Sequence, residues 1–483
     1  MIRKIINSFI VFYSPKYPEI ISYMLQASEY RGLNYLVWFW KTTDFSKVEY
    51  RKKLEKTKVA IIIYNFLTLA ILIQILIGIY LIYLNIVGRL TGGWAFGLGI
   101  IVLYPVLWSQ IIVIPVFFAR ILIINPYQKR LSKKAKKIFA DHKGIKIAVA
   151  GSYGKTSLKE FLFTVLGSQF NVAMTPKNKN VALSHAQFAL GLNNKEDILI
   201  VEFGEGEPGD IKRFSEIFKP DSGIITGLSP VHQDKYKSVD AAAKDLFTLE
   251  KYVAGNKLFV NNQSKYIKKY IKKSYSCFNE DGIADYRVKK VSSTEKGISF
   301  DLVSKKETLK IKSKLLGRHQ IGPLCLVAYL GLDFGMEKED IQKAILKIEP
   351  YEHRMQAYTL NGATIIDDSY NGNIEGLRAG LELLRELKFR KKIYVTPGLV
   401  DQGSLTKEIH QEIGHLIAGA NPDQVVLINN SVTHYIQEGL TKAGFKNDLV
   451  IEKDPLFYYN NLADFVAKGD LVLIQNDWTD NYL

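Results

Sequence analysis

A short glycine-containing string offers the clearest chemistry in this sequence, because its residue types suit the binding of a phosphate group. The string covers residues 151–157 and reads Gly151, Ser152, Tyr153, Gly154, Lys155, Thr156 and Ser157. It follows the apolar run Ile145–Ala150 directly and opens a helical pattern, so backbone amides and a helix N-terminus would face an anion together. Lys155 would add positive charge for the outer phosphates, and the Thr156 hydroxyl could bind Mg²⁺. The string therefore predicts a phosphate loop rather than a plain helix cap, although Val149 breaks the usual GxxxxGK[ST] spacing.

A carboxylate near this loop is a candidate metal ligand. Glu202 stands near the end of the apolar run Ile198–Phe203. The carboxyl ends of parallel strands gather ligand groups at one edge of a sheet, and a carboxylate there could hold Mg²⁺ beside the phosphates. The alternative is an ordinary surface acid at a strand end. The neighbouring phosphate loop favours the metal-binding hypothesis.

Alternating strands and helices must position these groups. From Gly144 onward, short apolar runs alternate with amphipathic helical patterns, which predicts βαβ units around a mainly parallel sheet. Residues 285–314 look like a more antiparallel insert. A second α/β block begins near Thr364, with strands expected at 364–367, 392–396, 424–428 and 470–474. We therefore expect an α/β fold in two blocks, the second of them Rossmann-like.

Two long apolar runs precede these blocks. Val59–Gly88 and Leu90–Ala119 contain no charged side chain, and only Arg89 separates them. Each run exceeds the roughly 20 residues that cross a hydrocarbon core. Core helices of soluble domains rarely stay uncharged over such lengths, and a cleavable signal peptide would begin nearer Met1. We predict a two-helix transmembrane hairpin.

Basic residues on both sides of the hairpin set its expected orientation. They stand between Lys47 and Lys58 and between Arg120 and Lys137, with no acidic residue in the second stretch. Basic flanks stay in the cytoplasm, so the chain is expected to be a multi-pass protein of the cell membrane with its catalytic domains in the cytoplasm. The same residues would attract anionic membrane lipids. The aromatic segment Leu33–Trp40 is too short to span a membrane and is expected to lie in the interface.

The composition narrows the classes of partner. The net charge of +16 is compatible with nucleic acid, lipid surfaces or phosphorylated substrates. Its concentration beside the apolar runs favours lipid, and the sequence has no recognisable nucleic-acid-binding module, so nucleic acid is not expected as a partner. The two cysteines, Cys277 and Cys325, stand in no CxxC or Cys/His cluster, which argues against a disulfide framework or a zinc site.

The phosphate loop resembles the shortened loop of Mur ligases, which make the peptide stem of peptidoglycan. Further strings follow in the order that the family has them: residues 200–204, 208–211, 219–221, 223–226, 316–320, 353–355 and 366–373. The last of them contains Asp367-Asp368-Ser369-Tyr370-Asn371, which is similar to the DDSYNANP string of the MurF type. The chain is thus identified as a membrane-anchored member of the Mur ligase family, MurF type.

This resemblance implies an ATP site completed by residues outside the loop. These residues are His319, Gln320, Arg354, Asp368, Tyr370 and Asn371. The first two stand in a string similar to the GxHN stretch that contacts adenine. The arginine and the aspartate would reach the nucleotide from the neighbouring domain, where an arginine neutralises the γ-phosphate and helps to exclude water. The last two would lie against adenine and ribose, an Asx turn being the alternative.

The resemblance also implies Mg²⁺, held by Thr156, Glu202 and His232. His232 matches the metal histidine of the family, whereas a lone histidine is otherwise a polar surface or core residue. Lys155, Glu202, His232 and Arg354 would be the catalytic residues. Their task would be positioning and charge neutralisation.

Substrate recognition is where the sequence departs most from the family. Thr175, Asn178 and Asn180 stand where the family has a GNxN stretch near substrate and metal, with Lys177 replacing the glycine. A polar turn is the equal alternative. The N-terminal UDP-binding domain of the family has no evident counterpart, and residues 475–482 replace a KGSR-like string.

A family lysine that carries a carbamate is also replaced. Leu246 occupies its position, and Lys244 lies two residues earlier. Two residues on a helix are about 200° apart, which is the wrong face. Either a local register shift brings Lys244 to the metal, or the carbamate is absent.

We therefore predict an ATP-dependent amide-bond ligase that acts through an acyl phosphate in cell-wall peptide synthesis. The leading substrates are a muramyl peptide precursor, UDP- or lipid-linked, and D-Ala-D-Ala. The alternatives are a ligase that adds another amino acid or amine to a lipid-linked precursor, a membrane-bound NTPase, and an inactive ligase-like scaffold. Five segments are expected: an interfacial segment 1–58, a hairpin 59–119, a basic linker 120–143, a central ATP-binding domain 144–350 and a C-terminal domain 351–483.

Overall fold

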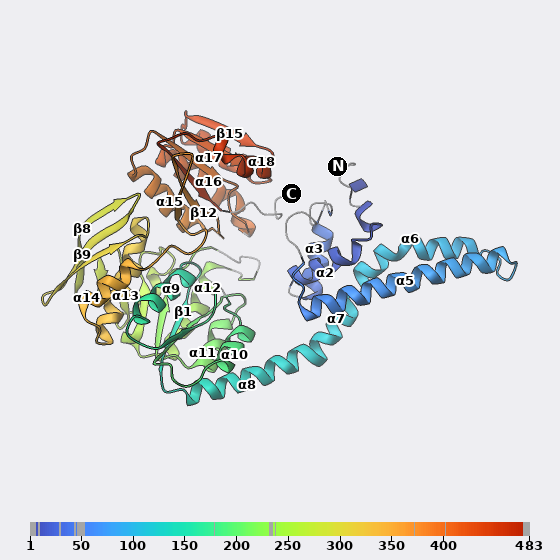
Figure 1. Cartoon of the computed structure of the whole chain (residues 1–483), viewed down its shortest axis with the longest axis horizontal. Coiled ribbons are helices and arrows are strands. Elements are labelled where there is room, and N and C mark those ends of the chain that lie inside the picture. Colours follow the sequence, from blue (N-terminus) through green and yellow to red (C-terminus); the bar gives the residue numbers. More distant parts are fainter. Residues whose placement is uncertain are drawn as a thin grey trace. The chain divides into compact units, whose positions relative to one another are not determined.

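The computed structural model shows two compact units, one up to Lys129 and one over Arg130–Tyr482 (Figure 1). The residues described are 6–7, 10–28, 30–42, 45, 54–177, 179–230, 235–236, 238–370, 372–400 and 402–476, without the side chains of 455–457. Each unit has its own hydrophobic core.

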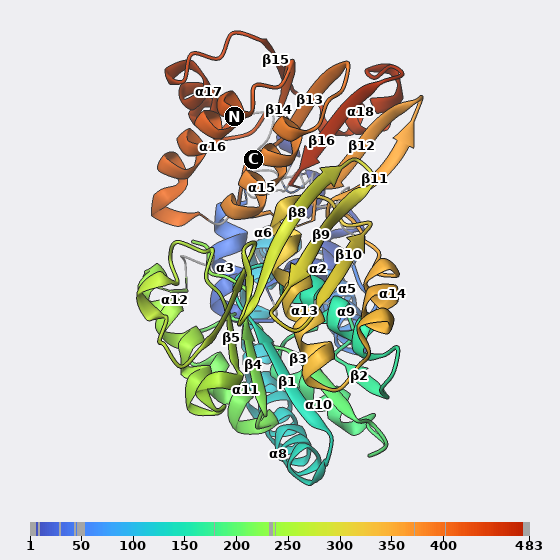
Figure 2. The same cartoon turned by 90° about the vertical axis from the view of Figure 1, so that its left-hand side faces the viewer.

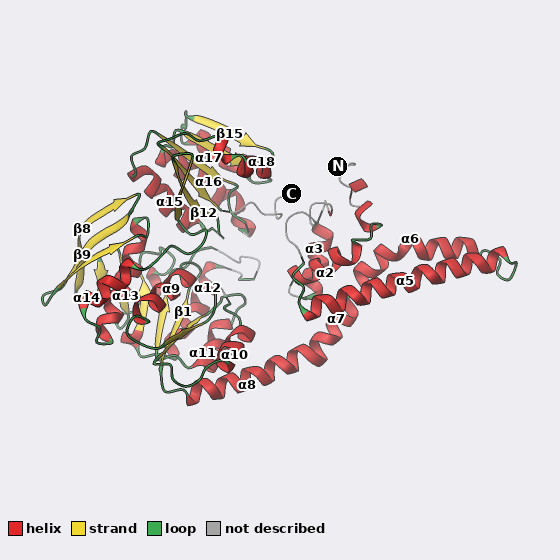
Figure 3. Ribbon diagram, viewed as in Figure 1, coloured by secondary structure: helices red, strands yellow, loops and turns green. Residues whose placement is uncertain are grey.

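The first unit is helical throughout its described elements (Figure 3). Its elements are α2 (Tyr17–Ala27), α3 (Gly32–Lys41), α5 (Lys58–Ile86), α6 (Gly93–Ile111), α7 (Val113–Ala119) and the π-helical turn η2 (Arg120–Ile124). Helices α5 and α6 form a hairpin in which Gly78 meets Gly97. A Cβ on Gly97 would overlap the Gly78 carbonyl oxygen, so the close approach requires glycine.

Helices α2 and α3 pack onto one end of this hairpin. Tyr17 and Tyr35 are fully buried there. The Tyr17 hydroxyl donates to the Pro105 carbonyl at 2.6 Å, and the Tyr35 hydroxyl donates to the Ser109 carbonyl at 2.8 Å. The segments Lys58–Ile86 and Gly93–Asp141 are long and apolar enough to cross a membrane, so their length and composition are compatible with the predicted hairpin.

The larger sheet of the second unit has ten strands in the order β10-β9-β8-β7-β6-β5-β4-β1-β3-β2. The parallel strands are β1 (Ile145–Ala150), β2 (Val172–Met174), β3 (Ile198–Glu202), β4 (Ser222–Ile225), β5 (Leu258–Asn261) and β6 (Ser276–Asn279). Antiparallel strands extend this sheet: β7 (Gly282–Ile283), β8 (Tyr286–Thr294), β9 (Gly297–Val303) and β10 (Thr308–Ser313). Figure 2 shows the last three of them side by side. The antiparallel insert expected at 285–314 is therefore part of the same sheet.

Helices cover both faces of this sheet. One core contains α9 (Lys155–Leu166), α13 (Ile321–Asp333) and α14 (Lys338–Leu346). The other contains α8 (Asn125–Asp141), α10 (Ala182–Leu190), α11 (Asp210–Phe218) and α12 (Val239–Leu246). Short 3₁₀ turns are η3 (Phe247–Lys251), η4 (Gly255–Lys257), η5 (Lys268–Tyr270) and η6 (Arg318–Gln320).

Helix α8 occupies most of the stretch expected to be a basic linker. Its Leu131, Ala135 and Phe139 are buried in the core that also contains α10, α11 and α12. The centres of the Phe139 and Phe218 rings lie 5.0 Å apart there. Its basic side chains are exposed: Lys129, Arg130, Lys133, Lys134, Lys136 and Lys137. The helix is amphipathic because its apolar residues recur at a spacing of four.

The C-terminal block has six strands in the order β11-β12-β16-β13-β14-β15. They are β11 (Gln356–Leu360), β12 (Ala363–Asp368), β13 (Lys391–Thr396), β14 (Gln424–Ile428), β15 (Asp448–Glu452) and β16 (Asp470–Gln475). Its helices are α15 (Ile374–Glu386), α16 (Thr406–Ala420), α17 (Thr433–Lys442) and α18 (Pro455–Asn460), with η7 (Gly403–Leu405) and η8 (Leu462–Asp464). All strands but β11 run parallel, so the carboxyl ends of β12, β13 and β16 share one edge.

Candidate active site

The phosphate loop joins β1 to α9 and is held against the end of β4. Gly151 and Gly154 have φ values of 135° and 75°. A Cβ on Gly151 would overlap the Thr226 hydroxyl. That hydroxyl donates to the Tyr153 carbonyl, and the Ser152 amide donates to the Gly227 carbonyl at 2.9 Å. The loop thus has a fixed shape in front of the N-terminus of α9, as an anion site requires.

Lys155 opens α9 and pairs with a carboxylate. Its ammonium lies 2.8 and 3.1 Å from the two carboxylate oxygens of Glu205, and it also donates to the Gly151 carbonyl. Both side chains are largely buried, with 12% and 9% exposure. Sequence reasoning missed Glu205, for which the only signal was its place three residues after Glu202.

Glu202 ends β3 and is fixed through its backbone and its side chain. The Thr156 hydroxyl donates to Oε2 at 3.0 Å, and Asn180 Nδ2 donates to Oε1 at 3.1 Å. The Glu202 amide donates to the Thr175 hydroxyl, and His185 Nε2 donates to the Glu202 carbonyl at 2.8 Å. Burial lowers the pKa of His185 to about 4, which keeps the ring neutral.

The Thr156 and Glu202 oxygens fit a magnesium ion. Their separation of 3.0 Å matches that of neighbouring ligands placed about 2.1 Å from an octahedral ion. A hydroxyl and a carboxylate are oxygen donors of the kind Mg²⁺ prefers. Thr175 and Asn180, expected near substrate and metal, both touch Glu202.

Three expected site residues lie outside the described residues: Asn178, His232 and Asn371. Their roles stay predictions. Lys244 is described, and it points to solvent with 71% of its side chain exposed, its ammonium 3.0 Å from Asp240. Leu246 is buried in the core. The structure therefore does not bring Lys244 to the buried Glu202.

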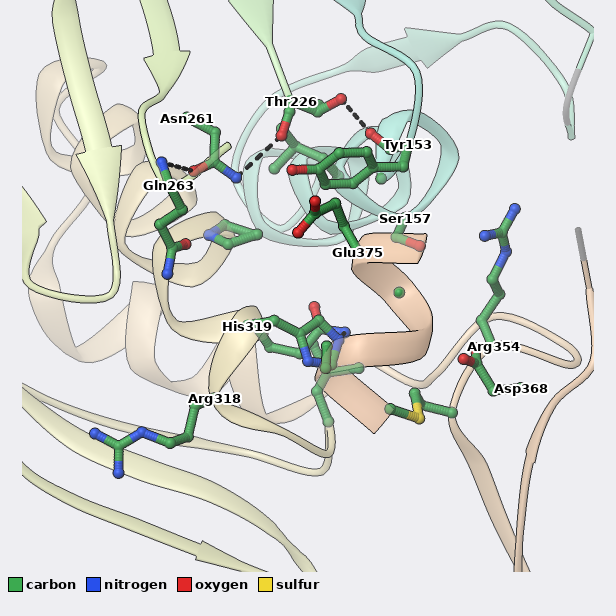
Figure 4. A pocket seen from close by; sticks show the side chains of 18 of the residues that line it. Tyr153, Ser157, Thr226, Asn261, Gln263, Arg318, His319, Arg354, Asp368 and Glu375 are labelled. Carbon is green, nitrogen blue, oxygen red and sulfur yellow. Dashed lines mark hydrogen bonds between the residues drawn. The ribbon is translucent and has the colours of Figure 1, made fainter. Parts of the chain in front are cut away.

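A cavity of about 440 Å³ opens between the phosphate loop and the C-terminal block (Figure 4). The residues expected at the nucleotide that line it are Tyr153, Gly154, Ser157, His319, Gln320, Arg354 and Asp368. Residues that were not anticipated also line it: Thr226, Asn261, Gln263, Glu375 and Arg378. Tyr370 does not line it but stacks on Arg354, whose guanidinium lies 4.7 Å from the ring centre. The predicted nucleotide residues of the two blocks thus converge on one cavity.

Several buried polar atoms along the cavity have no hydrogen-bond partner among the described residues. They are His319 Nδ1, Arg354 Nε and Glu375 Oε1. Burial lowers the pKa of His319 to about 4, and Gln320 lies 2.9 Å from its Nε2. With Gln320 donating to Nε2, the ring proton is on Nδ1. The cavity therefore offers an arginine donor, an imidazole donor and a carboxylate acceptor, which fit the mixed donors and acceptors of a nucleotide.

Asp368 lies at the cavity wall with an altered acidity. Burial raises its pKa to about 6, although Gln475 and Arg354 oppose the rise. Gln475 Nε2 donates to Asp368 Oδ2 at 2.8 Å, and the Tyr394 hydroxyl donates to Gln475 Oε1 at 3.1 Å. Gln475 thus fixes the Asp368 carboxylate through this hydrogen bond. It stands in the C-terminal string whose departure from the family was noted, but its role was not foreseen.

The chain matches two protein-family models. One is described as the Mur ligase middle domain and matches residues 149–330. The other is described as the Mur ligase glutamate ligase domain and matches residues 353–475. Together they span the phosphate loop, the strand carrying Glu202 and the block carrying Arg354 and Asp368.

Two curated relatives are both described as UDP-N-acetylmuramoyl-tripeptide--D-alanyl-D-alanine ligase. The one from Bacillus subtilis is 26% identical over 387 residues, which cover 77% of this chain and 81% of the relative. The one from Borreliella burgdorferi is 28% identical over 329 residues, which cover 66% of this chain and 68% of the relative.

Solved structures of similar fold include two described as MurF. The Acinetobacter baumannii protein has a TM-score of 0.64 at 19% identity, covering 72% of this chain and 77% of that protein. The Thermotoga maritima protein, in complex with ADP, has a TM-score of 0.63 at 21% identity, covering 72% and 80%. The predicted α/β fold is confirmed.

Proposed function

We propose, since this chain belongs to the Mur ligase family and is a ligase that forms carbon–nitrogen bonds, that it uses ATP to join D-alanyl-D-alanine to a muramyl peptide precursor. The names of the Bacillus subtilis and Borreliella burgdorferi relatives support this choice of substrates. The reaction would contribute the terminal dipeptide of a peptidoglycan stem.

The observation that carries the proposal is the group of residues around the phosphate loop. Thr156 and Glu202 present oxygens 3.0 Å apart beside the loop, and Lys155 stands at the start of the same helix. The adjoining cavity has unsatisfied polar atoms from both family domains. Phosphates at the loop would leave the nucleoside in reach of that cavity.

In the proposed reaction, an oxygen of the peptide carboxylate attacks the γ-phosphorus of ATP. The bond from that phosphorus to the bridging oxygen breaks, ADP leaves, and an acyl phosphate forms. The dipeptide amine then attacks the acyl carbon, phosphate leaves with its oxygen, and the amine gives up a proton. Most of the catalysis of such phosphoryl transfers is positioning and charge stabilisation.

The residues of this chain divide that work. The Lys155 ammonium would leave Glu205 and pair with the outer phosphates instead. Arg354 would neutralise the γ-phosphate from the C-terminal block. Thr156 and Glu202 would hold Mg²⁺, which supplies charge neutralisation when bound, with His232 as a third proposed ligand. His319, Gln320 and Asp368 would hold the nucleoside, and Tyr370 would keep Arg354 in place through ring contact.

We further propose that the apolar helices hold the chain at the cytoplasmic face of a membrane. The supporting facts are two membrane-length helices and the basic, exposed face of α8. A lipid-linked precursor would then share the bilayer with the enzyme.

The test measures ADP release and product mass with purified full-length protein. ADP should form only when both a muramyl tripeptide precursor and D-alanyl-D-alanine are present, and the product mass should equal their sum less one water. Lys155→Ala should fold normally and lose turnover, because the phosphate charge loses its partner. ADP release that needs neither acceptor nor amine would instead indicate an NTPase, and no ADP release under any condition would indicate an inactive scaffold.

A further inference from the structure

Lys159 is a fully buried lysine in α9, four residues after Lys155. Its side chain has 0% exposure. A buried ammonium costs several kcal/mol unless it is paired and hydrogen-bonded, so its contacts define what it does. Nothing in the spacing of the sequence distinguishes it from an ordinary helix residue.

The Lys159 ammonium contacts two segments at once. It donates to the Thr175 carbonyl at 2.8 Å and to the Lys177 carbonyl. It also lies 3.4 Å from Glu202 Oε2, the oxygen that accepts the Thr156 hydroxyl. One cation therefore ties the loop that follows β2 to the carboxylate at the end of β3.

The same loop holds Glu202 from other sides. This 175–180 loop, described except for Asn178, supplies the Thr175 hydroxyl to the Glu202 amide and the Asn180 amide to Oε1. The Asn180 carbonyl accepts from the Gly204 amide at 2.9 Å. Loop, carboxylate and α9 thus form one hydrogen-bonded cluster with Lys159 at its buried end.

We propose that Lys159 is a positioning residue, which fixes the 175–180 loop against Glu202 and thereby orders the binding site for the acceptor peptide. The step from loop to acceptor rests on the proposed function. The step from Lys159 to loop order stands on the contacts alone. Without the ammonium, two loop carbonyls lose a donor and Glu202 loses its buried counter-charge. The Thr175 and Asn180 contacts remain, so the loop stays on β3 but opens more readily.

The test compares the Lys159→Met variant with the wild-type protein, both at full length. Met keeps the length and apolar stem of lysine but removes the charge. Amide hydrogen exchange over residues 175–180 should accelerate by about tenfold or more, because local opening costs less. The KM for the acceptor should rise by about tenfold or more, since small displacements of positioning groups cost that much. The KM for ATP should change by less than about threefold.

Two further variants separate positioning from general damage. Lys195→Met makes the same change at an exposed lysine and should alter neither quantity. Lys159→Arg keeps the charge but not the compact ammonium. It should therefore fold even if Lys159→Met does not, and its loop exchange rate and its KM for the acceptor should lie between those of wild type and Lys159→Met.

Several outcomes would overturn the proposal. One is that the rate of amide hydrogen exchange over residues 175–180 is unchanged in both Lys159 variants. Equal rises in the KM for ATP and for the acceptor would indicate general destabilisation instead. Tighter Mg²⁺ binding with an undisturbed loop would make Lys159 a counter-charge only. Because hydrogen exchange needs no substrate, a wild-type protein inactive towards the proposed substrates would refute the proposed function and still leave Lys159 testable.

Discussion

Two ion pairs, each of one lysine and one glutamate, lie beside the phosphate loop. Lys155 pairs with Glu205, and Lys159 pairs with Glu202. The second pair is sealed from solvent, whereas the first is 9–12% exposed and faces the place where phosphates would bind. The first pair must therefore open for a nucleotide, and the second need not.

The Lys155–Glu205 pair leads to a prediction for Glu205→Gln. Removing the carboxylate frees Lys155 and removes repulsion of the phosphates, so ADP and ATP should bind about three- to tenfold more tightly. Calorimetric titration measures this directly. Glu339→Gln changes an exposed glutamate of α14 and should leave the affinity unchanged. Weaker nucleotide binding in Glu205→Gln would mean that Glu205 assists the nucleotide rather than competing with it.

Asp368 leads to a prediction about pH. Its pKa is raised by burial from 3.8 to about 6, so the folded protein holds this proton more tightly than the unfolded chain. The stability from this proton is present below about pH 4 and is lost as the pH rises to about 6. Asp368→Asn does not titrate, so its stability relative to wild type should rise over that range by at most about 3 kcal/mol.

Denaturant unfolding of both proteins between pH 4 and 7, without nucleotide, provides the measurement. The difference between the two unfolding free energies isolates Asp368 from all other titrating groups. A constant difference across this range would show that the carboxyl is not destabilised by its surroundings.

Residue types and strand positions predicted the part of the site that lies at one edge of the larger sheet. Thr156 and Glu202 meet as expected because a phosphate loop and the next strand end share one sheet edge. Glu205, Lys159 and Gln475 were missed because their roles depend on which neighbour a side chain reaches in three dimensions. Nothing in a single sequence distinguishes a buried lysine from an exposed one at the same helix position.

At the scale of elements, the hydrophobic patterns located most strands of both sheets. The strands expected at 392–396 and 424–428 correspond to β13 and β14. The edge strand β15 was not predicted, since one-sided burial leaves no long apolar run. The stretch 120–143 was expected to be a linker because of its charge, yet its buried Leu131, Ala135 and Phe139 make it a helix of the core.

Helix α12 leads to a prediction about the missing carbamate. The hydrogen bond that the Lys244 ammonium donates to the Asp240 carboxylate raises the pKa of Lys244, and the ammonium is exposed. Carbamate formation needs a neutral amine, so this environment disfavours it. Lys244→Ala should keep activity within about twofold, as expected for loss of an exposed ion pair, and removing bicarbonate should have no effect on wild type. Loss of activity in Lys244→Ala that short carboxylic acids restore would instead place Lys244 at the metal.

At the scale of the whole molecule, helix α8 has an apolar side and a basic side with different roles. It follows the apolar segment 93–124 without a break in helix, and its apolar side packs into the core of the catalytic unit. Its basic side remains exposed. A tether does not help an enzyme whose substrates all diffuse freely, but it raises the local concentration of any substrate in the same bilayer.

The last prediction is that the acceptor is a lipid-linked precursor. The full-length protein in bilayer discs containing anionic phospholipid should use a lipid-linked acceptor with at least about tenfold higher kcat/KM than a UDP-linked one bearing the same peptide, because tethering raises effective concentration. Dilution of the lipid-linked acceptor into detergent should remove the difference. Replacing Lys133, Lys134, Lys136 and Lys137 by Gln should lower the rate on the lipid-linked acceptor only, since each basic residue near an anionic surface contributes roughly 1 kcal/mol.

A protein truncated before α8, starting near residue 125, keeps the buried face of that helix and should lose the preference for the lipid-linked acceptor. If that truncated protein uses the UDP-linked acceptor as well as the full chain uses the lipid-linked one, the helices serve only to locate the enzyme, and the substrate is soluble.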